Sequence, residues 1–193
     1  MNRVNRVLFL LCGMLFGMVS FGFTDELVIQ NFDSDVRTDQ VCRNFGAWNK
    51  DPDDESQGCV ESLDAQARVG DQGMSLRLDY DVDSPNPAYN GFWLQMRDLD
   101  FSKYKYLNFD VKGDKDKGFS KVVKFELKNG QQVGRYLYTE MTDEWKHAKI
   151  PFSSFKGLKD WTKMTEFVIV FDDLNSKPKV GTMNVDNIVV TTD

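Results

Sequence analysis

Four segments of the chain alternate apolar and polar side chains with a period of two, over residues 74–82, 92–97, 107–112 and 123–128. Successive side chains of a β-strand point to opposite faces, so each segment predicts a strand with one face on a core and one in water. Residues 167–171 are apolar at every position and predict a central strand. Long helical periodicity is absent, and roughly ten short strands predict an all-β, two-sheet antiparallel jelly-roll sandwich.

The N-terminal residues have the pattern of a signal peptide. Arg3 and Arg6 precede the mostly apolar stretch 7–19, and small residues follow at the two positions that a signal peptidase reads. We therefore expect residues 1–22 to be a signal peptide and residues 23–193 to form a single domain. The predicted localisation is secreted, periplasmic or at the cell surface.

The chain is acidic, with a formal net charge of −6. Removal of residues 1–22 takes away two arginines and no acids, which leaves 22 − 30 = −8. An acidic surface argues against nucleic acid and against anionic membranes as partners, because both require basic residues.

Export would leave two cysteines, Cys42 and Cys59. In an oxidising compartment such a pair predicts a disulfide, which would close a loop that includes the acidic run 51–55 and has little to bury. A bridge across a loop of this size is worth about 3 kcal/mol in the chain-entropy model. The alternative is a pair of free thiols.

Several short motifs follow one another in a characteristic order along the chain. They are Asn31-Phe32-Asp33 and residues 73–78, 91–94, 99–107, 111–114, 142–145, 150–155 and 185–188. This order resembles the galactose-binding-like jelly-roll carbohydrate-binding modules, in particular the β-glucan-binding type appended to bacterial endoglucanases. The resemblance implies a polysaccharide-binding protein, with β-glucan as the first candidate ligand.

The same resemblance implies a structural calcium ion held by Asp33 and Asp186 where the first and last strands meet. Calcium takes six to eight oxygen ligands, so turn carbonyls would have to supply several. The alternative is that both carboxylates cap turns through backbone N–H groups.

The resemblance also implies that strands around Trp93, Glu126, Arg135 and Val168 share one sheet whose outer face binds sugar. An aromatic platform flanked by charged and amide groups suits a sugar, which has apolar C–H faces and hydroxyl rims. A surface tryptophan covered by a neighbouring loop is the alternative for Trp93. The candidate carbohydrate-binding residues are Trp93, Gln95, Arg97, Glu126, Arg135, Tyr136, Tyr138 and Asp172.

The orientation of Tyr136 and Tyr138 depends on the length of the hairpin loop at Asn129-Gly130. A loop with an even number of residues turns Arg135 outward and buries both tyrosines, and an odd number does the reverse. We expect exposed tyrosines, because two buried hydroxyls would both need hydrogen-bond partners.

No catalytic motif is recognisable in the chain. His147 is the only histidine, and no serine or cysteine lies in an evident nucleophile motif. We therefore expect a non-catalytic protein rather than an enzyme. The alternative function is an extracellular structural or adhesion protein that uses the same fold to bind another protein.

Overall fold

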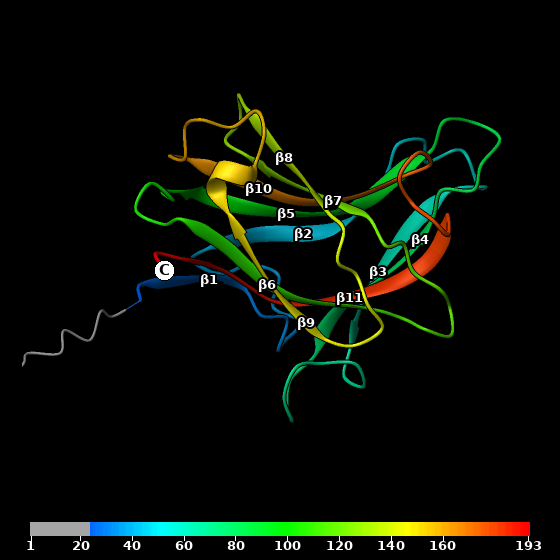
Figure 1. Ribbon diagram of the computed structural model, residues 1–193, viewed down its shortest axis with the longest axis horizontal. Coiled ribbons are helices and arrows are strands. Elements are labelled where there is room, and N and C mark those ends of the chain that lie inside the picture. The colour runs from blue at the N-terminus through cyan, green and yellow to red at the C-terminus, as the bar shows by residue number, and fades with distance from the viewer. Residues whose placement is uncertain (1–23) are drawn as a thin grey trace, which may run out of the picture.

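Two antiparallel sheets face each other in the computed structural model, which describes residues 24–193 (Figure 1). The predicted signal peptide lies outside the described residues. No helix between residues 24 and 193 is long and apolar enough to span a bilayer. The elements are β1 (Glu26–Gln30), β2 (Cys42–Asn49), β3 (Gly58–Asp64), β4 (Ser75–Asp81), β5 (Tyr89–Leu99), β6 (Tyr106–Gly113), β7 (Val123–Lys128), β8 (Val133–Tyr138), β9 (Lys146–Pro151), the 3-10 helix η1 (Phe152–Ser154), β10 (Met164–Asp172) and β11 (Val180–Thr191).

One layer is the β11 sheet, with the order β3-β4-β11-β6-β9 and with β1 added alongside β11. The other layer is the β10 sheet, with the order β2-β5-β10-β7-β8. This arrangement confirms the all-β, two-sheet antiparallel sandwich. It also confirms the central strand predicted at residues 167–171, because β10 is the middle strand of its sheet.

The core lies between the sheets and is built from the apolar positions of the alternating segments. Leu76, Leu78, Phe92 and Leu94 are all buried, as are the corresponding positions of β6 and β7. Aromatic rings fill much of this space, and Tyr80 and Phe171 stack across it at 4.0 Å. Since alternate positions are buried, the polar positions of β5, β10 and β7 must face outward, where they form a surface.

The chain ends meet as expected, because β1 pairs with β11 from Glu26 opposite Thr191 to Gln30 opposite Ile188. Asp186 lies within β11, but Asp33 follows the end of β1 rather than lying in it. Phe32, which lies between the end of β1 and Asp33, has a positive φ of 56° and turns the chain out of the strand.

The orientation expected for Tyr136 and Tyr138 was wrong. The β7–β8 loop has four residues, 129–132, and this even number turns Arg135 outward. Tyr138 is 4% exposed and packs on Phe109 and Phe125, and Tyr136 packs against the core beside Phe155. The hydroxyl of Tyr138 has no hydrogen-bond partner among residues 24–193, so the cost that favoured exposure is present but is outweighed by burial of the ring.

The Cys42–Cys59 disulfide was also wrong, since both thiols are free and buried. The segment 43–60, expected to be a loop, instead contains all but the first residue of β2 and the beginning of β3. Cys42 begins β2, whereas the N–H of Cys59 bonds the side chain of Asn49 at the other end of that strand. Seven residues of extended chain separate the two positions by about 20 Å, far beyond the reach of a disulfide.

Candidate functional site

The outer face of the β10 sheet carries most of the predicted site residues. Gly46, Trp93, Val168, Glu126 and Arg135 lie opposite one another in a single row across all five strands. The sequence therefore identified correctly which strands share this sheet. It also identified which side chains of β5 and β7 face outward.

A groove of about 400 Å³ runs over this face, and we call it the aromatic groove. Aromatic rings form its β2–β5 side, where Trp48 and Tyr89 meet edge to face with ring centroids 5.8 Å apart. Its lining residues are Trp48, Tyr89, Trp93, Lys124, Glu126, Lys128, Glu166, Val168 and Val170.

Glycines make room on the aromatic side of the groove. Gly91 lies opposite Trp48 on one side and Val170 on the other. A side chain on Gly91 would overlap a backbone oxygen of β10, so the neighbouring strands require glycine here. Gly46 lies beneath the indole of Trp93, because a Cβ there would be 3.5 Å from that ring. Trp93 is therefore half-buried, and its indole lies over Gly46 of β2.

The opposite side of the groove is charged and internally neutral. Lys124 pairs with Asp172 at 3.2 Å and Lys128 pairs with Glu166 at 2.9 Å, each linking β7 to β10. Arg135, outside the groove lining, pairs with Glu126 of the lining at 3.2 Å and links β8 to β7.

Asp172, at the end of β10, lies outside the groove lining, and its carboxylate bonds to the protein itself. Its Oδ1 accepts hydrogen bonds from the backbone N–H groups of Leu174 and Asn175, and its Oδ2 contacts Lys124. Burial raises the pKa of this carboxyl, but the Asn175 N–H and the Lys124 ammonium together hold the pKa below its ordinary value. Asp172 therefore positions Lys124 and is not a free hydrogen-bonding group.

Two other predicted residues of β5 lie outside the groove lining. Gln95 faces outward between Asn44 and Glu166. Arg97 is exposed, and its Nε donates a 2.6 Å hydrogen bond to the carbonyl oxygen of Asp39. Tyr136 and Tyr138 face the core, so the structure does not bring them to the groove.

The sequence reasoning missed Trp48, Tyr89 and Glu166 as groove residues. Trp48 had a usable signal, because Phe45 and Ala47 alternate with Gly46 and Trp48 in β2. The neighbouring acidic run led us to treat that segment as a loop instead.

Asp33 and Asp186 come close at the end of β1. Asp186 is 2% exposed, and its carboxylate accepts hydrogen bonds from the N–H groups of Val69 at 3.0 Å and Asn187 at 2.8 Å. Burial, with the nearby carboxylates of Asp33 and Asp110, raises the pKa of Asp186 to about 6.

The conformation around this pair also requires a glycine, since any side chain on Gly73 would overlap the carboxylate of Asp33. Within residues 24–193, no three His, Cys, Asp or Glu side chains are grouped to hold a metal. Any cation bound here would therefore depend on backbone oxygens for much of its coordination.

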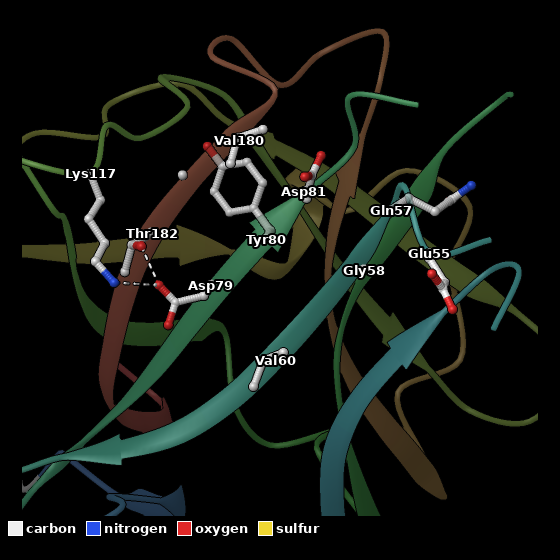
Figure 2. Close-up of a pocket in the computed structure, with 11 residues that line it drawn as sticks. Glu55, Gln57, Gly58, Val60, Asp79, Tyr80, Asp81, Lys117, Val180 and Thr182 are labelled. Carbon is white, nitrogen blue, oxygen red and sulfur yellow. Dashed lines mark hydrogen bonds and ion pairs between the residues drawn. The ribbon is translucent and has the colours of Figure 1, made fainter. Parts of the chain in front are cut away.

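A second hollow, of about 460 Å³, lies on the outer face of the β11 sheet (Figure 2). Figure 2 shows Lys117 and Thr182 directed at Asp79, with Val60 on the neighbouring strand. Its single aromatic residue, Tyr80, is 2% exposed and stacked in the core, so it offers no ring face to a ligand. The aromatic groove is therefore the better candidate site for a sugar.

The comparisons with known proteins agree with this geometry. Residues 33–192 match the family model described as carbohydrate binding domain 30. No curated protein sequence gives a significant match.

Several solved structures share the fold. The family 11 carbohydrate-binding module of a cellulosomal cellulase of Clostridium thermocellum is 17% identical, with a TM-score of 0.62 over 88% of this chain and 95% of that one. A Clostridium thermocellum family 11 module in complex with a β-1,3-1,4-mixed-linked tetrasaccharide is 18% identical, with a TM-score of 0.61 over 86% and 94%. A cyclase from Fischerella sp. is 11% identical, with a TM-score of 0.55 over 86% and 96%.

Proposed function

Because the chain belongs to the carbohydrate binding domain 30 family, we propose that it binds β-glucan without cleaving it and that the aromatic groove is its binding site. The observation that supports this most directly is the division of the groove into an aromatic side and a neutral, ion-paired side. A similar fold carries a mixed-linked β-1,3-1,4 tetrasaccharide in the Clostridium thermocellum complex, which makes mixed-linked β-glucan the first ligand to test.

The two sides of the groove suit the two surfaces of a glucan chain. Trp48, Tyr89 and Trp93 present apolar area that the C–H face of a glucose ring can bury. Glu126 and Lys128 offer a carboxylate and an ammonium to sugar hydroxyl groups, since each retains unused hydrogen-bonding capacity beside its ion-pair partner. A neutral polymer is favoured because each charged residue of the groove lining has an opposite charge beside it.

Affinity electrophoresis on soluble mixed-linked β-glucan, xylan and mannan tests the proposal. We expect retardation by the glucan, and we expect Trp93→Ala to weaken it by about thirtyfold or more, since an aromatic anchor is typically worth about 2 kcal/mol. Lys128→Ala should have a much smaller effect. Thermal melts of both variants control for stability, and a folded Trp93→Ala with unchanged glucan affinity would place the site elsewhere.

The alternative is an extracellular structural or adhesion protein, and the fold by itself does not decide, because it also occurs in a cyclase. Absence of retardation on every glycan, together with persistent self-association or protein complex formation, would favour that alternative. Release of reducing sugar from any tested substrate would contradict the non-catalytic role.

We also propose a structural calcium ion at Asp33 and Asp186. Two observations support it: Asp186 is buried with other carboxylates nearby, which disfavours its charge without a cation, and Gly73 leaves room for Asp33 to approach. The cation would stabilise the junction of the first and last strands. Calcium should raise the melting temperature and a chelator should lower it, whereas unchanged melting in both conditions would rule the site out.

Export through a signal peptide at residues 1–22 completes the proposal. It is supported by the charged and apolar pattern of the sequence. N-terminal sequencing of the protein recovered from outside the cytoplasm should begin near residue 23, and a retained Met1 would contradict it.

A further inference from the structure

A third hollow lies at the end of the sandwich that holds the β5–β6 loop, η1 and the C-terminus, on the left of Figure 1. It has a volume of about 320 Å³, and we call it the end hollow. Its lining is mainly aromatic and consists of Tyr104, Lys105, Tyr106, Pro151, Phe152, Ser153 and Trp161. It is separate from the aromatic groove, with which it shares no residue.

The aromatic part of the end hollow is rigid. Trp161 stacks on Phe152 with ring centroids 4.0 Å apart and planes 5° from parallel, and Phe152 stacks on the buried Phe101 at 6.0 Å. The N–H of Phe101 bonds the carbonyl of Trp161, and the N–H of Phe152 bonds the carbonyl of Lys105. Three separate segments are thereby fixed. Phe101 and Phe152 are buried, so of this stack a ligand would meet the partly exposed ring of Trp161, already held in place.

The charges around the end hollow differ from those of the groove. Lys103 and Lys149 place their Nζ atoms 4.9 and 4.5 Å from the ring centroids of Tyr104 and Tyr106. Lys103 pairs with Asp25, but Lys105 and Lys149 have no carboxylate within ion-pair distance among residues 24–193. Both ammonium groups are therefore available to pair with a negatively charged group of a ligand, unlike Lys124 and Lys128 of the groove, which already pair with acids.

From this arrangement we infer that the end hollow is a second glycan site, and that it takes a sugar bearing a carboxylate, a uronic acid unit of an acidic polysaccharide. The ring's C–H face would bury apolar area on the aromatic lining, and its carboxylate would pair with Lys105 and Lys149. The groove, whose charges are already paired, has no such preference. The protein would then connect neutral and acidic polysaccharides through two separate sites.

The probe is a tetramer of (1→4)-linked galacturonic acid, compared by calorimetry with its carboxyl-reduced, neutral counterpart. We expect the acidic tetramer to bind, the neutral one to bind at least about tenfold more weakly, and added salt to weaken only the acidic one. Lys105→Gln and Lys149→Gln should each reduce binding of the acidic tetramer by about tenfold. Lys115→Gln, which removes the same charge from the β6–β7 connection, should leave it unchanged.

The groove variant separates this inference from the proposed function. Trp93→Ala should keep its affinity for the acidic tetramer, whereas Lys105→Gln should keep its affinity for mixed-linked β-glucan. Absence of binding to the acidic tetramer, equal binding of the neutral tetramer, or loss of acidic binding in Trp93→Ala would each overturn the second site. Equal competition by tetraglutamate would also overturn it, because the hollow would then recognise acidic peptides rather than sugars.

Discussion

Neutralising Asp186 should stabilise the calcium-free protein near neutral pH. Burial, with Asp33 and Asp110 nearby, raises the pKa of the Asp186 carboxyl from 3.8 to about 6 in the folded state. The folded protein therefore binds more protons than the unfolded chain between these two values, and its stability falls as the pH rises through that window. At about 1.4 kcal/mol per pKa unit, the charged form costs roughly 3 kcal/mol at pH 7.

Asp186→Asn removes this charge and keeps the shape of the side chain. It also loses one acceptor, since an amide has a single oxygen and the carboxylate receives two N–H groups, from Val69 and Asn187. That loss costs about 1 kcal/mol. We therefore expect the variant to be more stable than the wild type by about 2 kcal/mol at pH 7 in a chelator, with the advantage disappearing toward pH 4.

Urea unfolding from pH 4 to pH 7, with chelator and with millimolar calcium, measures the pH dependence of stability and the effect of calcium on it. Carboxyls with lowered pKa values, such as Asp79 and Asp172, lose their contribution at the acid end in both proteins, so the difference between the proteins isolates Asp186. Asp33→Asn should lower the folded-state pKa of Asp186, because the Asp33 charge helps to raise it. The pH range over which stability falls should then be narrower. Parallel pH profiles for the wild type and Asp186→Asn in chelator would refute the reasoning. Calcium should stabilise the wild type alone.

Three further predictions concern the interior. Tyr138→Phe should leave stability unchanged or raise it by about 1 kcal/mol in urea unfolding, because the hydroxyl it removes is buried without a partner; a clear loss would reveal a partner. Gly91→Ala should unfold the protein or cost several kcal/mol because its methyl group would overlap the β10 backbone, whereas Gly46→Ala makes only ordinary contacts and should cost less than about 1 kcal/mol. Cys42 and Cys59 should resist alkylation in the folded protein, since burial raises both thiol pKa values, that of Cys42 to about 11, and both should react without reduction in denaturant; mass spectrometry showing an intramolecular bridge would contradict the structure.

The sandwich could be predicted from the sequence because alternation records which face of each strand is buried. The burial of Leu76 is indicated by the polar residues on either side of it in the chain. The uniformly apolar residues 167–171 indicate a strand in the centre of a sheet. A period of two fixes the facing of every residue within one strand. It does not fix how the facing carries over to the next strand, which depends on the length of the loop between them.

The error at Tyr138 arises from that limit, and the error at the cysteines arises from two strands that were not recognised. A four-residue hairpin loop, one residue longer than exposure of Tyr138 would need, reversed the facing of β8. For Cys42 and Cys59, compartment and an even count suggested a bond, but Cys42 begins β2 and Cys59, in β3, lies beside Asn49 at the other end of β2. Local composition indicated neither the length of the hairpin loop nor the separation of the two cysteines.

The groove shows why ligand choice depends on pairing as well as on residue types. Lys124, Lys128 and Arg135 taken alone suggest an anion site, yet register places an acid beside each of them and the surface becomes neutral. Lys105 and Lys149 have the same chemistry but stand beside tyrosines and proline, with no acid of residues 24–193 in reach. The strand register thus distributes similar cations into two surfaces, one suited to hydroxyl groups and the other to a carboxylate, and that difference is what the paired glycan titrations measure.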